Sequence, residues 1–348
     1  MSRHLIVLPD DSPKEFLKAI AKAKESLRIK MFIFSDPAMR KAVIAAHRRG
    51  VRVRVMLNPV RRDGTGENKA TRTALLAAGV EVMDSNPKFP VTHEKSMVVD
   101  SKIAFINSLN WNTENLEETR DYAIRTKHAH EVQEVIDGFE ADWHRHHFDP
   151  GEGAHMIWAV GNARERIARL IDGAKHTLCL QHERYQDPVI LERLVRAKMR
   201  GVEVRVMARA PHTLKEKKLL EGVGGMRVLD DVGIKVHKLH HLKLHAKLVM
   251  ADGKRAIVGS VNLAPGSFDE RRELAIEVDD HKIVRRLSRI IDRDWKHSRP
   301  IDLSDEGLAR DLKKYGPEVI HELALDPDLD PETKAKPKRR STSKKKRR

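Results

Sequence analysis

Two stretches of the chain carry the same residue types at the same spacing, 152 positions apart. The pattern is His-x-Lys, four residues, Asp, six residues, and then a small or polar residue followed by Ser-x-Asn. Its members are His93, Lys95, Asp100, Asn107, Ser108 and Asn110 in the first copy and His245, Lys247, Asp252, Gly259, Ser260 and Asn262 in the second. A bare His-x-Lys would arise by chance about once or twice in a chain of this composition, so only the whole pattern, present twice, is informative.

The residue types in each copy suit a phosphate group. A neutral imidazole can attack phosphorus or, once protonated, supply a proton, while ammonium, hydroxyl and amide groups donate hydrogen bonds to phosphate oxygens. Displacement at phosphorus needs a nucleophile on one side and an acid for the leaving oxygen on the other. One copy supplies half of this, and two copies that face each other supply both. The sequence therefore predicts a phosphodiester-cleaving site shared by the two copies.

Each copy is predicted to lie on a strand and on the hairpin that follows it. Residues i and i+2 of a strand face the same side, so each His projects together with its Lys. Apolar residues follow each pair (97–99 and 248–250), turns are expected at 100–102 and 252–254, and return strands at 103–106 and 256–258 bring Ser and Asn back beside the His. We expect Asp100 and Asp252 to shape the turns rather than to touch substrate.

A second repeat, independent of the motif, supports a duplicated fold. Residues 49–56 (RGVRVRVM) recur as 200–207 (RGVEVRVM), and the alternating valines are typical of a half-buried strand. Helices are predicted at 37–49 and 188–200, directly before these strands. The alternation predicts two α/β halves, each a mixed sheet flanked by helices. We expect the halves at 1–147 and 155–300, a linker at 148–154, a C-terminal helical extension at 301–330 and a disordered basic tail at 331–348.

Composition narrows the class of partner without choosing one. The formal charge of +16 favours polyanions, either nucleic acid or acidic lipid headgroups, and ten Lys or Arg lie between residues 331 and 348. Aromatic residues make up 4% of the chain, which leaves few platforms on which bases could stack. Cys179 is the single cysteine, so no internal disulfide can form. With no signal-peptide pattern and no apolar run of about 18–20 residues, we expect a cytoplasmic protein.

The duplicated pattern resembles the HxKx4Dx6GSxN motif of the phospholipase D superfamily, over roughly residues 1–300. The resemblance implies two homologous phospholipase D-like halves packed with pseudo-twofold symmetry, and a reaction through a phosphohistidine that needs no metal or other cofactor. It implies His93 as the nucleophile and His245 as the acid. The residues implied to hold the phosphate are Lys95, Lys247, Asn110 and Asn262, with Ser108 and Ser260 assisting.

The resemblance also implies an acid that orients each histidine through its second ring nitrogen. Asp121 and Glu273 stand eleven residues after the motif asparagines in matched contexts, so we predict this role for them; the alternative is a solvated acid near a strand start. Asn107 departs from the motif, which has glycine there. Glycine there permits a positive φ or a close backbone approach. Asparagine is the next most tolerant residue of that conformation, so we expect the geometry to survive, with a less competent first half as the alternative.

Other residues leave several interpretations open. Two clusters of histidines could bind zinc, contact substrate or be plain surface residues. They are His144, His146 and His147, and His237, His240 and His241. We predict substrate contact for His240 and His241 and no metal site. Residues 182–185 follow a strand that should end near the site and could contact substrate, whereas Trp111 is expected in the core.

Three functions follow from these observations. The first is a phospholipid enzyme, hydrolysing a headgroup or transferring a phosphatidyl group as cardiolipin synthases do, with peripheral membrane contact through the basic tail at 334–348. The second is a nuclease that cleaves DNA or RNA. The third is a non-catalytic basic protein that binds anions through a site that has lost its activity. Two complete motifs favour an enzyme, and a monomer is expected to hold a complete active site.

Overall fold

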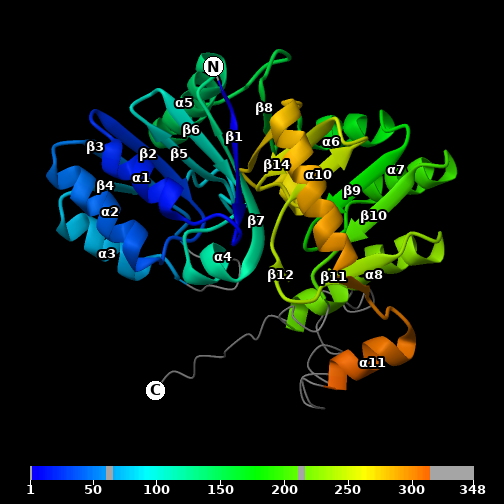
Figure 1. The fold of residues 1–348 in the computed structure, drawn as a ribbon. Helices are drawn as coiled ribbons and strands as arrows, with labels where there is room; N and C mark the ends of the chain where they lie inside the picture. Colours follow the sequence, from blue (N-terminus) through cyan, green and yellow to red (C-terminus); the bar gives the residue numbers. More distant parts are fainter. Residues whose placement is uncertain (1, 60–65, 211–215, 314–348) are drawn as a thin grey trace, which may run out of the picture.

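The computed structural model describes the backbone of residues 2–59, 66–210 and 216–313, and the side chains of all of these except 216–221 and 311–313. The chain forms two α/β halves that lie side by side, each a mixed sheet flanked by helices (Figure 1). This is the fold class that the sequence predicted.

The first sheet contains β1 (His4–Leu8), β2 (Ser26–Met31), β3 (Arg52–Leu57), β4 (Glu81–Asp84), β5 (Lys95–Val99), β6 (Ile103–Asn107) and β7 (Thr119–Thr126). Their order is β1-β7-β6-β5-β2-β3-β4. The edge β2-β3-β4 is parallel, as strand–helix–strand connections require, and the motif hairpin β5–β6 is antiparallel.

The second sheet repeats this arrangement. It contains β8 (Met156–Trp158), β9 (Thr177–Gln181), β10 (Glu203–Met207), β11 (Val236–Leu239), β13 (Leu248–Ala251), β14 (Arg255–Gly259), β15 (Leu274–Val278) and β16 (Ser298–Pro300). Their order is β16-β11-β10-β9-β13-β14-β15-β8. Apart from the added β16, each strand has its counterpart in the first sheet, so the repeat read from the sequence is a repeat of the fold.

Helices cover both sheets. Those of the first half are α1 (Lys14–Lys22), α2 (Pro37–Arg48), α3 (Lys69–Ala77), α4 (Thr113–Glu117) and α5 (Ala129–His144). Those after it are α6 (Ala163–Asp172), α7 (Pro188–Met199), α8 (Glu216–Asp231), α9 (Pro265–Asp269), α10 (His281–Lys296) and α11 (Asp305–Lys313). The predicted helices at 37–49 and 188–200 are α2 and α7. Among the described residues, no helix is long and apolar enough to cross a bilayer.

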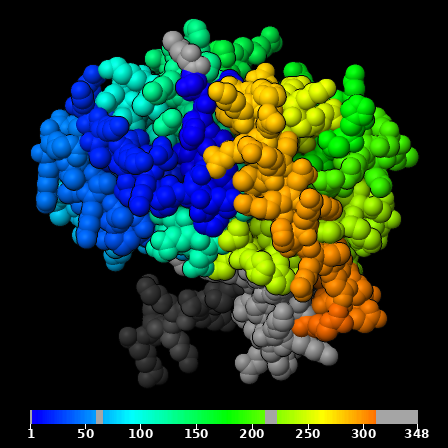
Figure 2. Space-filling view, viewed as in Figure 1, coloured from blue at the N-terminus to red at the C-terminus, as the bar shows by residue number. Residues whose placement is uncertain are grey.

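One apolar core joins the two halves. It includes Tyr122 of β7, Val135 of α5, Trp158 of β8 and Leu287 of α10, all fully or almost fully buried. Burial on this scale is the main source of adhesion between the halves. Figure 2 shows the N-terminal segment and α10 in contact along the same boundary.

Backbone contacts across the boundary position both motif histidines. β12 (Lys243–Leu244) belongs to the second half yet pairs with β7 of the first, and the backbone N–H of His245 then donates to the carbonyl oxygen of Arg120 at 3.3 Å. In return, the backbone N–H groups of His93 and Glu94 both donate to the carbonyl oxygen of Arg272 at 2.9 Å. Each histidine is therefore held by the backbone of the opposite half.

These contacts correct one prediction. The motif strands begin later than expected, β5 at Lys95 and β13 at Leu248, so His93 and His245 precede the strands rather than lie on them. The physical reason is that the N–H groups just before the strands bond to the opposite half instead of to a sheet neighbour. Of the predicted extension at 301–330 the structure describes residues 301–313, and the predicted basic tail lies outside the described residues.

Candidate active site

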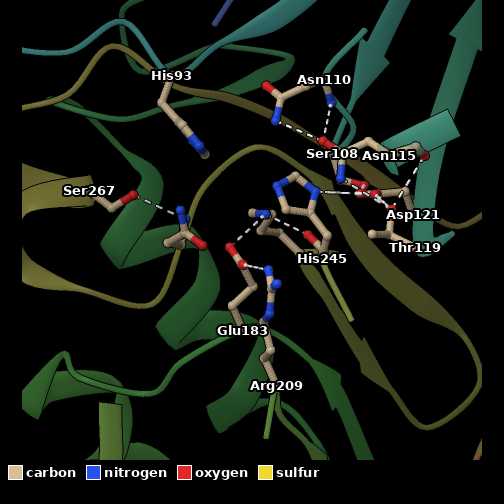
Figure 3. Close-up of polar contacts among 12 residues, drawn as sticks. His93, Ser108, Asn110, Asn115, Thr119, Asp121, Glu183, Arg209, His245 and Ser267 are labelled. Carbon is tan, nitrogen blue, oxygen red and sulfur yellow. Dashed lines mark hydrogen bonds and ion pairs between the residues drawn. The ribbon is translucent and has the colours of Figure 1, made fainter. Parts of the chain in front are cut away.

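The imidazoles of His93 and His245 point into one shared space (Figure 3). Each ring is held by an acid of the other half. Nδ1 of His93 lies 2.9 Å from Oε2 of Glu273, and Nδ1 of His245 lies 2.9 Å from Oδ1 of Asp121. An Nδ1–H donated to the acid leaves Nε2 as the atom available for chemistry. The structure thus brings the four predicted residues together and adds that both pairs cross the boundary.

Hydroxyl groups fix the two acids. Ser108 donates to Oδ1 of Asp121 at 2.5 Å, and Thr119 donates to Oδ2 at 2.6 Å. Ser267 donates to Glu273. Sequence reasoning missed Thr119 and Ser267, although Thr119 stands two residues before Asp121 on the same strand face, a spacing that could have revealed it.

The motif serines bond to the chain at or next to these acids. Ser108 also accepts the backbone N–H of Tyr122 at 2.9 Å, and Ser260 accepts that of Leu274 at 3.0 Å. Both serines are fully buried. They therefore fix the strand residues next to the two acids, which differs from the predicted substrate contact.

The motif lysines and asparagines surround the same space. Lys95 and Lys247 each donate to the main-chain carbonyl of the histidine two residues earlier, which fixes the ammonium beside the imidazole. The side-chain nitrogen of Asn110 donates to Asn115 at 2.9 Å, and its buried oxygen has no partner among the described atoms. The backbone N–H of Asn262 donates to Ser267 at 3.0 Å.

Burial and the two ammonium groups shift the titration of the site. Burial, followed by Lys95 and Lys247, holds the pKa of His93 well below its ordinary value, so this imidazole is neutral at pH 7. Burial, followed by Lys247, also lowers the pKa of Lys95 well below its usual range. Burial raises the pKa of Glu273 to about 7. Crowded cations depress one another's protonation, and a phosphate placed between them would relieve that repulsion.

The second acid behaves differently. Burial would raise the pKa of Asp121, but His245 and Lys247 outweigh it and hold that pKa below its ordinary value. Asp121 therefore stays ionised near neutrality while Glu273 is close to its titration point. Two acids in equivalent positions thus carry unequal charge, so the two histidines are not equivalent.

Phe32 and Glu183 occupy equivalent positions and add to this asymmetry. The ammonium of Lys95 lies 5.0 Å from the ring centre of Phe32, a cation–π contact. In the second half Nζ of Lys247 lies 3.3 Å from Oε2 of Glu183, whose other oxygen lies 3.3 Å from Nη1 of Arg209 (Figure 3). Glu183 falls in the segment 182–185 singled out from the sequence; no sequence pattern pointed to Phe32 or Arg209.

The residues next to the two acids brace the halves. Arg272, before Glu273, donates to Asp142 of α5 at 2.8 Å, and Arg120, before Asp121, donates to Asp294 of α10 at 2.8 Å. Both ion pairs are buried and cross the boundary. Removing one partner of such a pair leaves an uncompensated buried charge. Two consecutive residues, near the start of β7 and just before β15, therefore bind a helix and a histidine of the opposite half.

The remaining motif positions are structural. Asp100 accepts backbone N–H groups of residues 24–26, and Asp252 accepts those of residues 175–177, so each ties the hairpin to the start of the neighbouring strand, β2 or β9. Neither Asn107 nor Gly259 has a positive φ, so the first of the two reasons predicted for glycine in the motif does not apply, and the second, a close backbone approach, remains. A Cβ at Gly259 would overlap the backbone of Leu274 and Ala275, so the close approach of β15 accounts for the glycine.

The histidine clusters stand apart from this chemistry. Among the described residues no group of three or more His, Cys, Asp or Glu is placed to hold a metal ion. His237 stacks on Trp295 with ring centres 4.0 Å apart. His240 and His241 are exposed and line a groove together with Arg209. Trp111 is fully buried against Phe34, as predicted for a core residue.

Comparisons with known proteins show which family and fold the chain shares. The family model described as "Cardiolipin synthase, PLD-like domain" matches residues 16–143 and again residues 167–295. Cardiolipin synthase B of Escherichia coli strain K12 is 27% identical over 323 residues, covering 78% of this chain and 74% of that protein.

Solved structures share the fold. Polyphosphate kinase from Porphyromonas gingivalis superposes with a TM-score of 0.69 at 17% identity, covering 92% of this chain and 53% of that one. Phosphatidylserine synthase from Haemophilus influenzae Rd KW20 superposes with a TM-score of 0.66 at 10% identity, covering 89% of this chain and 92% of that one. At such identities the likeness extends to the fold alone.

The family model matches each half once, and each matched range includes one of the two histidines with its lysine. The chain therefore belongs to the cardiolipin synthase and phospholipase D-like family and is a phosphodiesterase of the phospholipase D type.

Proposed function

We propose that the protein transfers phosphatidyl groups between phospholipids through a phosphohistidine intermediate. The observation that carries the proposal is the pair His93 and His245, which face one space with each ring held by an acid of the other half. The similarity to Cardiolipin synthase B over 78% of the chain supports phospholipids as the substrate class. The positive charge of +16 suits acidic lipid headgroups.

In the first step, Nε2 of His93 attacks phosphorus of the donor lipid, forming the N–P bond. The P–O bond to the headgroup alcohol breaks, and protonated His245 gives its Nε2 proton to the leaving oxygen. Neutral His93 suits the nucleophile, because a depressed pKa leaves its lone pair free at pH 7.

In the second step, His245 acts as a base. It takes the proton from the hydroxyl of an acceptor lipid, whose oxygen attacks phosphorus as the N–P bond to His93 breaks. Lys95, Lys247 and Asn262 stabilise the negative charge on the phosphate oxygens in both steps. His93 and His245 are only 8% and 7% exposed, which favours an alcohol delivered by a bound lipid over bulk water.

The proposed reaction takes place on a single chain, at the surface of a membrane and without a metal ion. Both histidines, both lysines and both acids come from one chain, so a monomer suffices for catalysis. Contact with a membrane would be peripheral, through basic residues of the chain. No step calls on a metal ion, because the two imidazoles supply both the nucleophile and the acid–base group.

The test is incubation of pure protein with mixed phospholipids and, separately, with single- and double-stranded DNA and RNA, all in excess chelator. We expect phospholipid to be consumed and a new phosphatidyl ester to form. His93→Asn protein serves as the blank for contaminating activity. Consumption of nucleic acid with phospholipid untouched would replace the proposal by a nuclease, and loss of activity on chelation would overturn the metal-free mechanism.

A further inference from the structure

A groove of about 640 Å³ opens beside the catalytic centre. It is lined by the end of β10 and the residues after it, by residues 238–244 with β12, by the end of α4 and by Arg299 of β16. Its volume falls within the range of ordinary ligand sites, about 300–1,000 Å³. None of the reaction steps described above uses this space.

The groove and the catalytic centre share a wall. Arg209 lines the groove and donates to Glu183 at 3.3 Å, and Glu183 in turn accepts from Lys247 at 3.3 Å. Leu244, another lining residue, directly precedes His245. A molecule lying in the groove would therefore end close to the imidazole that handles the acceptor's proton.

The positive charge in the groove is neutralised on the α4 side and remains on the β11–β16 side. Lys243 is neutralised by Glu114 and Glu118 at 3.0 Å each, on the side formed by α4. On the opposite side, Lys238 and Arg299 make no ion pair with any described carboxylate. Glu117 also lines the groove and reduces, without cancelling, this excess of positive charge.

The two unneutralised cations are forced together by the sheet. Lys238 and Arg299 are direct partners in the antiparallel pair β11–β16, where opposed side chains leave the same face about 4.5–5.5 Å apart at Cβ. Like charges in such positions destabilise a sheet unless an anion lies between them. The positive charge of this region also acts on His240, because Arg299 and His241 lower its pKa below the ordinary value.

We infer that this groove binds the phosphate group of the acceptor lipid, so that the acceptor's alcohol reaches the catalytic centre. The inference rests on the proposed phosphatidyl transfer and extends it by assigning the acceptor's phosphate to a subsite at Lys238 and Arg299. Lys238 and Arg299 take the phosphate oxygens, and the apolar lining residues Leu239 and Leu242 suit the lipid part beside it. The lining contains His240 and His241 but no Phe, Tyr or Trp, and so small an aromatic surface for stacking bases favours a lipid over a nucleic acid.

The experiment compares two soluble acceptors with one phosphatidylcholine donor. Glycerophosphoglycerol carries a phosphate next to its alcohol, and glycerol carries the alcohol alone. In the double variant Lys238→Ala/Arg299→Ala we expect KM for glycerophosphoglycerol to rise at least about tenfold, the effect of losing one or two charge-assisted hydrogen bonds. We expect KM for glycerol to change less than twofold.

The matched control is Lys41→Ala/Arg48→Ala on α2. It removes the same two charges from exposed positions outside the groove and should leave both KM values as in the wild type. The charge-conserving pair Lys238→Arg/Arg299→Lys should restore most of the affinity for glycerophosphoglycerol. Equal changes for both acceptors, or no change for either, would overturn the inference.

Two further arms separate the remaining outcomes. If wild-type protein transfers to neither acceptor, the proposed function fails; calorimetric binding of glycerophosphoglycerol, present in the wild type and lost in the double variant, would then still support the groove. Inorganic phosphate that inhibits at concentrations far below KM would show a free-phosphate site rather than a lipid one. Tighter binding of an oligonucleotide than of vesicles rich in phosphatidylglycerol, abolished by the double variant, would assign the groove to nucleic acid and overturn the inference.

Discussion

Nδ1 of His93 lies 2.9 Å from Oε2 of Glu273, a residue 180 positions later in the chain and in the other half of the fold. The reciprocal contact joins His245 to Asp121. Neither half can therefore orient its own histidine. Catalytic competence depends on the packing of the halves, and the buried pairs Arg272–Asp142 and Arg120–Asp294 fix that packing at the residues next to the acids.

The first prediction assigns the two histidines. With a phosphatidyl ester of p-nitrophenol, the leaving group needs no proton, so His245→Asn should still form the phosphohistidine and then stall. His93→Asn should release no p-nitrophenol. We expect natural phospholipid turnover to fall by at least about 10³-fold in both variants. Acid-quenched protein analysed by mass spectrometry would detect the trapped adduct.

The control for this experiment is His146→Asn, which alters an exposed histidine outside the site. It should turn over phospholipid at the wild-type rate, and all three variants should unfold at similar temperatures. An adduct found on His245 in the His93→Asn protein would reverse the assignment of nucleophile and acid.

The second prediction concerns the crossed contact of Asp121. Asp121→Asn removes the charge that stabilises protonated His245, and we expect kcat to fall about 10²- to 10⁴-fold. Because the acid acts only through the histidine, Asp121→Asn/His245→Asn should be no slower than His245→Asn alone. Steady-state kinetics of the two single variants and the double variant measure this. Losses that multiply would show that Asp121 acts on substrate independently of His245.

The sequence predicted the parts of the site better than their pairing. The repeat identified His93, His245, Asp121 and Glu273, because motif spacing is a local property of the chain. Which acid holds which histidine depends on contacts between residues more than 120 positions apart. No local periodicity encodes such a contact, so the exchange between halves is visible only in the fold.

The different neighbours of Lys95 and Lys247 could not be predicted from the sequence, for a related reason. Phe32 and Glu183 lie just beyond equivalent strands, outside any motif, and their chemistry is unrelated. Only the structure places one beside Lys95 and the other beside Lys247. For Ser108 the sequence left the partner open, because a serine hydroxyl can bond to a phosphate or to a carboxylate. In the structure the buried hydroxyl donates to Asp121.

The third prediction is a pH dependence set by Glu273. Burial raises the pKa of this carboxyl to about 7, so it takes up a proton as the pH falls through 7 and then no longer holds His93 as a charged acceptor. We expect kcat/KM to fall as the pH drops from 8 to 5, with a midpoint near 7. Glu273→Gln should lower the plateau and remove this limb. A limb that persists in the variant would have to come from another group.

The same shift has a consequence for stability. A carboxyl whose folded pKa lies above its unfolded value binds its proton more tightly in the folded state. Its stabilising contribution is complete below the unfolded pKa and is lost as the pH rises through about 7. The midpoint of thermal unfolding of Glu273→Gln, which is always neutral, should therefore fall less between pH 5 and pH 8 than that of the wild type.

The last prediction tests why the two motifs differ at one position. Gly259 pairs with Ala275 in β14–β15, and a Cβ there would overlap the backbone of that strand. Gly259→Asn should therefore push β15 away, lower the free energy of unfolding by about 1–3 kcal/mol and displace the adjoining Glu273. Asn107→Gly is the matched change in the first half: it removes a buried amide that has no partner among the described atoms, and should shift stability by no more than about 1 kcal/mol. Urea unfolding measures both values, and a Gly259→Asn protein as stable as the wild type would contradict a close approach of β14 and β15.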